Sequence, residues 1–209
     1  RPEVLVAHLG MSGQFKIQSA DSEYERHLRA NFQLSSGKEL RFIDQRTFGW
    51  LCVDQIQDDA PDIVSHIALD PFDSNFDKRK VVAEISKRRS QIKKVILDQS
   101  IISGIGNIYA DEALWYAKIH PEAISSELSS TQILNILTAA QKVMRRALAA
   151  GGTSFDELYI NVNGESGYFE RSLAVYGQEG EPCRRCGSEI VRIAFANRSS
   201  RLCPACQTR

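Results

Sequence analysis

Two Cys-x-x-Cys pairs near the end of the chain restrict most strongly what this sequence can fold into. They are Cys183–Cys186 and Cys203–Cys206, and sixteen residues separate them. Two residues between cysteines let one tight turn aim both thiolates at one ion, and two such pairs complete a tetrahedral shell of four sulfurs. A closed shell has no open position for water, so the sequence predicts one structural Zn²⁺ held by Cys183, Cys186, Cys203 and Cys206. Two disulfides, or four buried thiols, are the alternative.

The residues between the two pairs have the pattern of a β-hairpin. From Val191 to Phe195 apolar residues take alternate positions, which is typical of a strand with one buried face. Asn197–Ser200 is polar and predicts the turn that reverses the chain. We therefore expect a zinc-clamped hairpin whose tip presents Arg198. An ordinary exposed turn arginine is the plainer interpretation of that residue.

The first sixty residues predict a β-rich domain. An apolar run at Val4–Leu9 indicates a strand buried on both faces, and Phe32–Ile43 indicates a hairpin with a turn around Gly37. Asp44–Gly49 predicts a further turn before a strand at Trp50–Val53. So few strands would leave a sheet edge and one face uncovered, so we expect this region to be part of a sandwich or barrel.

After an acidic linker marked by prolines, the pattern becomes helical. Beyond Lys80 the apolar positions follow i, i+3, i+4 steps, which predicts a helix with Arg89 near the edge of its buried stripe. The residues that define this stripe are Val82, Ile85, Arg89, Ile92 and Ile96.

Two more helices are predicted further along. One follows Asn107, and the other starts at a capping box formed by Ser129 and Gln132 and ends at Gly151–Gly152. The sequence thus predicts an α+β multidomain fold. Its expected parts are a partial β-sandwich over residues 1–60, a linker over 61–76, a helical domain over 77–180 and a four-cysteine zinc finger over 181–209.

Composition limits the class of protein. The formal net charge is zero, which argues against a protein that binds nucleic acid through its overall charge. Eight lysines and arginines nevertheless lie in the stretch from Lys78 to Lys94. A local basic face binds polyanions whatever the global sum. Cys52 lies in an apolar run and is expected to be a buried free thiol, which fits a reducing compartment. No apolar run approaches the length of a membrane-spanning helix.

The stretch from Ser103 to Glu112 has the pattern of an anion site. Gly104 and Gly106 allow a tight turn, and Asn107 can cap the following helix while its amide and the neighbouring N–H groups face outward. Such a helix N-terminus suits an anionic oxygen. An ordinary turn between helices explains the same residues equally well. The stretch is not a dinucleotide fingerprint, because no buried strand precedes it.

Taken together, five stretches make the chain resemble the formamidopyrimidine-DNA glycosylase family, bacterial base-excision repair enzymes that act on oxidised purines. They span nearly the whole chain in the family's order. They are His8–Gly13, Asp44–Gly49, Leu97–Leu114, Tyr176–Gly180 and the two cysteine pairs.

The resemblance implies a helix–two-turn–helix domain and a set of DNA contacts. Gly106 and Asn107 would hold the phosphate next to the lesion. Met11, Arg46 and Phe48 would fill the gap left by the everted nucleotide, because a thioether and a ring replace lost stacking and a guanidinium bonds the orphaned base. From the residues alone, Met11 and Phe48 are more simply read as core residues.

Further roles follow from the same resemblance. His27 and Arg89 match contacts to the DNA backbone. Arg198 matches the arginine that contacts phosphates around the lesion and has a catalytic role in the second elimination. The loop from Thr153 to Phe169 matches the segment that closes over the damaged base. The partner would be double-stranded DNA with oxidised bases or abasic sites, bound by a monomer in the bacterial cytoplasm.

One departure concerns catalysis. The family's nucleophile is a free N-terminal proline followed by a glutamate, and a lysine on a following strand assists. Here Pro2 is acylated by Arg1 and has no free amine. We therefore expect the 209-residue chain to lack the catalytic head, to bind abasic or nicked duplex weakly and not to cut it. A Met-Pro-Glu start in frame upstream would mark a longer natural chain.

Two competing functions remain open from the sequence. One is the endonuclease VIII type, which removes oxidised pyrimidines, although Met11 and the spacing of Arg46 and Phe48 argue against it. The other is a non-catalytic zinc module that binds DNA or RNA, which would leave the turns at Met11 and Phe48 without a role.

Overall fold

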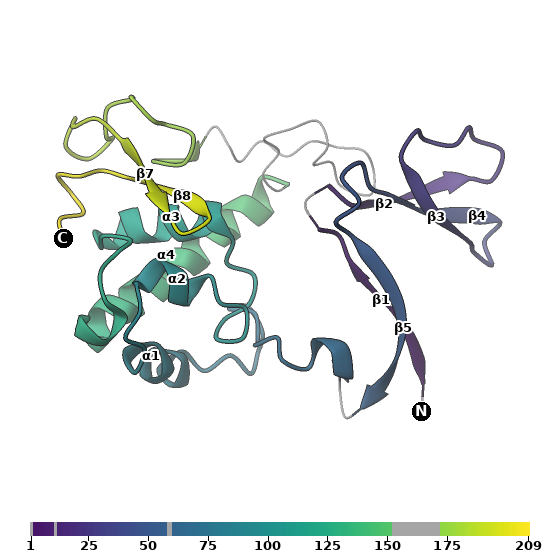
Figure 1. Cartoon of the computed structure of the whole chain (residues 1–209), viewed down its shortest axis with the longest axis horizontal. Coiled ribbons are helices and arrows are strands. Elements are labelled where there is room, and N and C mark those ends of the chain that lie inside the picture. The colour runs from purple at the N-terminus through teal and green to yellow at the C-terminus, as the bar shows by residue number, and fades with distance from the viewer. Residues whose placement is uncertain (1, 11, 58–59, 152–171) are drawn as a thin grey trace. The chain divides into compact units, whose positions relative to one another are not determined.

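The structure of the protein is a computed structural model that describes residues 2–10, 12–57, 60–151 and 172–209. The chain forms two compact units (Figure 1). The β-unit comprises Arg1–Ser65 with Ala147–Arg171, and the helical unit comprises His66–Arg146 with Ser172–Arg209.

The β-unit contains two antiparallel sheets of three strands each. In the first, the strand order is β1-β5-β6, and in the second it is β2-β4-β3. A short 3₁₀ helix, η1 (Asp62–Val64), follows the last strand. The strands are β1 (Glu3–His8), β2 (Gln14–Ser19), β3 (Leu28–Gln33), β4 (Lys38–Ile43), β5 (Trp50–Gln57) and β6 (Ala60–Pro61).

The strand predicted at Val4–Leu9 exists, but the prediction that both its faces are buried is wrong. Leu5 and Leu9 are 45% and 43% exposed. Within the described residues β1 pairs only with β5, and exposed and half-buried positions alternate along it, so one face is open and the other is only half-buried. The same openness makes Cys52 a half-buried free thiol where a buried one was expected.

The hairpin predicted around Gly37 is confirmed as β3 and β4, and the strand at Trp50 is confirmed as β5. The sequence did not indicate β2, which pairs with the other side of β4. The resulting sheet has two different faces. Phe15 and Phe42 pack with ring centroids 5.2 Å apart on one face, whereas Glu39 and Arg41 lie on the other.

The helical unit is built around an apolar core. Its helices are α1 (Lys78–Ser86), α2 (Ile92–Ile96), α3 (Asn107–Ala117), η2 (Ser125–Glu127) and α4 (Ser130–Ala149), and its hairpin is β7 (Val191–Phe195) with β8 (Arg198–Leu202). The fully buried side chains at the centre of this core include Ile85, Ile92, Ile96, Ile102, Leu114, Ile133, Ile136 and Leu137. Of the helices that the structure describes, none is both long enough and apolar enough to cross a membrane.

The helix predicted from Lys80 is in fact two helices, and Arg89 lies exposed in the connection between α1 and α2. Tertiary hydrogen bonds explain the break. Gln91 forms an antiparallel bridge with Ile124, and Ser125 N donates to Ser90 O at 2.9 Å. These bonds hold the chain extended where the apolar period alone would have continued the helix.

Both predicted termini of α4 are confirmed. Gln132 N donates to Ser129 Oγ at 3.3 Å, and Ser129 N donates to Gln132 Oε1 at 2.9 Å, which is the reciprocal pattern of a capping box. At the other end Gly151 has a φ of 76°, a left-handed conformation that glycine adopts without strain. The apolar stripe between these signals packs into the core.

Replacing the cap tests this account of α4. Ser129→Ala removes the acceptor for the N–H of Gln132 and is expected to lower the free energy of unfolding by about 1 kcal/mol. Urea denaturation followed by circular dichroism measures the change. Ser126→Ala is the matched control, because Ser126 is exposed in η2 and no cap depends on it; its effect should stay within about 0.5 kcal/mol. Equal effects of the two substitutions would contradict the capping role.

Candidate metal centre and nucleic-acid interface

The four paired cysteines come together as a metal site. The sulfurs of Cys183, Cys186, Cys203 and Cys206 all lie within 4.8 Å of one another. Cys186 Sγ is 3.4 Å from Cys203 Sγ and 3.5 Å from Cys206 Sγ. A tetrahedral zinc shell places its sulfurs about 3.8 Å apart, whereas a disulfide needs about 2.05 Å. The arrangement fits one structural Zn²⁺, and the disulfide alternative is wrong because all four cysteines are free.

The protonation of these thiols ties metal binding to pH. Hydrogen bonds from Ser188 and from the neighbouring thiols lower the pKa of Cys186 to about 6. Burial raises the pKa of Cys203 to about 12. Zinc binds thiolates, so its binding must displace the proton of Cys203, and zinc affinity falls as the pH falls.

The turn of the hairpin between the cysteine pairs is shorter than predicted. Ala196, with a φ of 48°, and Asn197 make the reversal, and β8 already begins at Arg198, which is exposed and pairs with Phe195. The prediction that Ser199 and Ser200 belong to the turn is therefore wrong. Hydrogen bonds from the helices hold both serines in the strand.

The buried ion pair of Lys93 and Asp111 makes the hydrogen bonds that hold Ser199 and Ser200 in strand β8. Lys93 Nζ lies 2.7 Å from Asp111 Oδ1, and both side chains are fully buried. Lys93 Nζ also donates to Ser199 O at 3.0 Å, while Ser200 Oγ donates to Asp111 Oδ1 at 2.7 Å. Arg201 N completes the set by donating to Asp111 Oδ2 at 3.1 Å. Strand β8 is thereby fastened to α2 and α3.

Burial and the attraction between the two charges shift the pKa values of this pair in opposite directions. Burial lowers the pKa of Lys93 and raises the pKa of Asp111, because each charge has left water. The attraction between the two charges opposes both shifts, and the hydrogen bonds from Ser200 and Arg201 oppose the rise in the pKa of Asp111. Nothing in the sequence predicts this pair beyond two adjacent acidic residues, Asp111 and Glu112, in a helix that is apolar on either side of them.

The glycine turn before α3 differs from its prediction in one respect. The N-terminal cap is Gly106, in an extended conformation, and Asn107 is the first residue of the helix and caps nothing. Asn107 Nδ2 instead donates to Ser199 O at 3.3 Å, and its Oδ1 is buried without a hydrogen-bond partner among the described residues. The structure thus brings Gly106 and Asn107 next to the strand that begins at Arg198.

Glu112 is a structural residue to which sequence reasoning gave no role. Its carboxylate accepts the N–H groups of Ala174, Val175 and Tyr176 at 2.8–3.0 Å. Burial raises the pKa of Glu112, and these three donors oppose that rise. The carboxylate fixes the start of the segment that leads from residue 172 into the zinc finger. Trp115 adds a second tie, because its Nε1 donates to Cys183 Sγ at 3.4 Å.

In the β-unit, Asp44 organises the predicted turn at Asp44–Gly49. It accepts Ser12 Oγ at 2.5 Å, Gly49 N at 2.8 Å and Arg46 N at 3.3 Å. Burial alone would raise the pKa of Asp44, but these hydrogen bonds outweigh it and lower the pKa. Phe48 projects from this turn and is 61% exposed, so the simpler reading of Phe48 as a core residue is wrong.

The turn is also in contact with the preceding Gly10–Gly13 segment. A Cβ at Gly10, whose φ is +62°, would lie 2.7 Å from the carbonyl carbon of Phe48, so only glycine allows this approach. Met11 lies outside the described residues, as does the loop from Thr153 to Phe169. His27 is half-buried, and its carbonyl accepts Asp44 N at 3.0 Å, which places it beside the turn.

Comparisons with known proteins agree along the whole chain. Residues 1–51 match the formamidopyrimidine-DNA glycosylase N-terminal domain, residues 67–157 match the formamidopyrimidine-DNA glycosylase H2TH domain, and residues 180–209 match a zinc finger found in FPG and IleRS. A formamidopyrimidine-DNA glycosylase of Rhodococcus opacus is 56% identical over 207 residues, which cover 97% of this chain and 72% of that protein. The chain belongs to the formamidopyrimidine-DNA glycosylase family.

Solved structures of the family share this fold. A Lactococcus lactis Fpg bound to DNA with an abasic site superposes with a TM-score of 0.86 at 30% identity, covering 99% of this chain and 76% of that one. A complex of the Lactococcus lactis enzyme with Fapy-dG DNA gives a TM-score of 0.84 at 30% identity, with the same coverage. The predicted α+β fold, with N-terminal sheets, a helix–two-turn–helix domain and a zinc-bound hairpin, is confirmed.

Removing the metal tests the zinc site. A chelator that strips zinc should leave four unpaired thiols, two of them buried, and unfold the hairpin, because structural zinc contributes folding energy directly. Zinc analysis should return one ion per chain, and chelation at pH 6 should be faster than at pH 8. Bound metal that is independent of pH, or a hairpin unchanged after zinc loss, would contradict the assignment.

Acidification tests the role of Asp44. Its pKa is lower in the folded chain than the unfolded value of about 3.9, so its contribution to stability is present above about pH 4 and is lost as the pH falls through the folded value. Exchange of the Gly49 amide, whose N–H bonds Asp44, should accelerate in that range relative to the intrinsic exchange rate at each pH. Asp44→Asn should accelerate it at neutral pH too and remove the acid dependence. An unchanged Gly49 amide in that variant would show that the turn stands without the carboxylate.

Proposed function

We propose that the chain serves base-excision repair as a bifunctional DNA glycosylase and AP lyase for oxidised purines. Its substrates would be 8-oxoguanine and formamidopyrimidine, and it would cleave the abasic strand by β- and δ-elimination. The observation that supports this best is the docking of the zinc hairpin beside the N-terminus of α3. It brings Gly106 and Asn107 next to the strand that begins at Arg198.

In this proposal the helical unit binds the phosphates of the DNA backbone. The N-terminal N–H groups of α3 lack partners within the helix, and a Cβ at Gly106 would meet nothing within 4 Å, so the backbone there is open to an anionic oxygen. Asn107 supports the same phosphate. Arg198, exposed on β8, would contact phosphates around the lesion and assist the second elimination as the catalytic residue of this hairpin. Arg89, exposed between α1 and α2, would add a contact to the DNA backbone.

The β-unit would fill the gap that the everted nucleotide leaves in the base stack. Phe48 exposes its ring from a turn whose backbone is fixed by Asp44, and a ring held this way can replace the stacking of the everted base. Arg46 would hydrogen-bond the orphaned base, and Met11 would fill the remaining space. His27, next to this turn, would contact the DNA backbone.

The proposed chemistry requires an amine nucleophile, and Pro2 cannot supply it. Arg1 acylates Pro2, so the nitrogen of Pro2 is an amide and cannot attack the C1′ carbon of a sugar. Pro2 is therefore not the nucleophile of the proposed reaction. We take residues 1–60, 61–76, 77–180 and 181–209 as the working domains of the chain, a monomer as its state, and the bacterial cytoplasm as its place of action, because the relatives are bacterial.

Binding to an abasic duplex tests the proposal. Phe48→Ala should weaken binding to a duplex with an abasic analogue by about tenfold, since stacking on one base is worth about 1–3 kcal/mol. Binding to the intact duplex should change less than about twofold. Fluorescence anisotropy at fixed salt measures both. Val53→Ala is the matched control, because Val53 is equally apolar and 68% exposed but lies on β5 outside the turn.

Two outcomes would speak against this function. An equal loss on both duplexes would remove the gap-filling role and favour a non-catalytic nucleic-acid-binding zinc protein. Borohydride trapping of a covalent adduct with the 209-residue polypeptide would contradict the account of Pro2. A panel of oxidised purines and pyrimidines, tested on a chain that carries a Pro-Glu start, separates the purine enzyme from the endonuclease VIII type.

A further inference from the structure

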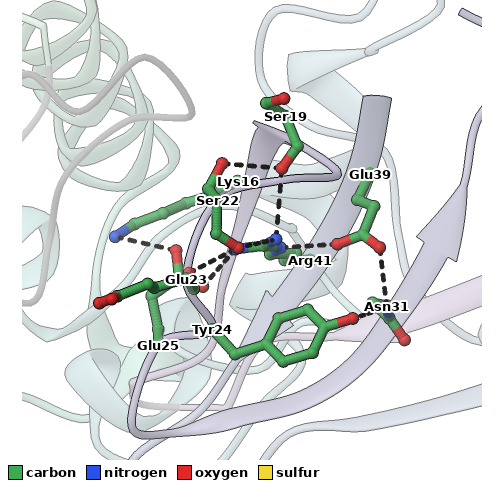
Figure 2. A network of polar contacts seen from close by, with 9 residues as sticks. All are labelled: Lys16, Ser19, Ser22, Glu23, Tyr24, Glu25, Asn31, Glu39 and Arg41. Carbon is green, nitrogen blue, oxygen red and sulfur yellow. Dashed lines mark hydrogen bonds and ion pairs between the residues drawn. The ribbon is translucent and has the colours of Figure 1, made fainter. Parts of the chain in front are cut away.

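The polar face of the β2-β4-β3 sheet is organised around one buried cation. Arg41, on β4, is fully buried, and Figure 2 shows the loop between β2 and β3 wrapped around its guanidinium. The group has five N–H donors, and five acceptors surround it at 2.8–3.3 Å. These acceptors are Glu39 Oε2, Glu25 Oε2 and the main-chain oxygens of Ser19, Ser22 and Glu23.

Three of those acceptors are main-chain carbonyls of one irregular segment. Three main-chain carbonyls bonded to one guanidinium restrain the path of the chain from Ser19 to Glu25. The Tyr24 ring covers the cation, with the guanidinium carbon 4.7 Å from the ring centroid. The opposite face of this sheet is closed by ordinary apolar packing of Phe15 on Phe42.

The segment that Arg41 shapes leads directly to the turn at Asp44–Gly49. Leu28 N donates to Glu25 O at 3.0 Å, and Asp44 N donates to His27 O at 3.0 Å. Arg29 Nε donates to Asp44 O at 2.8 Å. The main chain of Asp44 is thus held on both sides by residues 27–29, while its carboxylate holds the turn that exposes Phe48.

We propose that Arg41 is a positioning residue for the recognition of damaged DNA. By fixing segment 19–25, it fixes the place of His27 against Asp44, and so it presents His27 and the Asp44–Gly49 turn as one rigid surface. The inference rests on the proposed function, in which both parts of that surface touch DNA. A fully satisfied buried arginine specifies one loop conformation, whereas an apolar contact would tolerate several.

The alternative is that Arg41 only stabilises the sheet, and two variants separate the two roles. Arg41→Met keeps an unbranched side chain of similar length but removes all five donors. Phe15→Leu weakens the apolar face of the same sheet and leaves the Arg41 contacts in place. Both are compared by hydrogen exchange of the Asp44 and Gly49 amides, and by binding to abasic and intact duplexes, at a temperature where both are folded.

If Arg41 positions the turn, Arg41→Met should speed exchange of both amides by about tenfold or more, while Phe15→Leu leaves them within about twofold. The ratio of abasic to intact affinity should fall by about tenfold in Arg41→Met only. Equal effects of the two variants, or unchanged amides in folded Arg41→Met, would overturn the proposal.

A milder variant keeps the test decisive if Arg41→Met does not fold. Glu25→Ala removes one of the five acceptors, from a side chain that is 24% exposed, and leaves four in place. It should speed exchange of the Asp44 amide by about threefold, and no change there would overturn the proposal. A wild-type chain that binds both duplexes equally would contradict the proposed function, while the exchange data would still decide whether Arg41 positions the turn.

Discussion

The buried pair of Lys93 and Asp111 is the interaction on which the placement of the zinc finger depends. Zinc fixes the internal shape of the hairpin, but four sulfurs that all come from residues 183–206 cannot fix where the hairpin sits. The pair does so, because its two charged groups make three hydrogen bonds to Ser199, Ser200 and Arg201 at 2.7–3.1 Å. The two charges lie 2.7 Å from each other. Removing one partner from such a pair costs about 3–5 kcal/mol, since the other charge is left buried and unpaired.

Both units use a buried cation to hold part of the main chain in place. In each, an apolar core builds the regular elements, and a buried cation bonded to main-chain carbonyls places a neighbouring segment, which is strand β8 in one unit and the end of β2 with the following loop in the other. Lys93 holds Ser199 O, and Arg41 holds the carbonyls of Ser19, Ser22 and Glu23. Buried carboxylates do the complementary work on N–H groups, as Glu112 does for Ala174–Tyr176. Exposed side chains such as Phe48 and Arg198, which have roles only in the proposed function, can then be held in place without being buried themselves.

The parts of this structure that could be predicted from sequence are those set by neighbours along the chain. The cysteine spacing gave the zinc site, and Ser129 with Gln132 gave the start of α4, because the partners lie within a few residues. The break between α1 and α2 could not be predicted, since it depends on Gln91 meeting Ile124. The use of Asn107 was missed for the same reason, as its partner Ser199 lies 92 residues away. Element types followed from local pattern, whereas side-chain roles depended on contacts that no local pattern contains.

The structure also corrects the expectation, drawn from the sequence, of a strongly basic face between Lys78 and Lys94. Between Lys78 and Lys94 the sequence shows eight cationic residues, which suggests a strong polyanion surface. In the structure Lys93 is buried against Asp111, and Lys87 and Arg88 both pair with Glu84. A cation whose charge is already compensated gains less from a phosphate and releases fewer counterions on binding. The electrostatic part of DNA binding should therefore be weaker than the residue count suggests. In the proposed function, the recognition of damage would then rest more on the surfaces that present Phe48, Asn107 and Arg198.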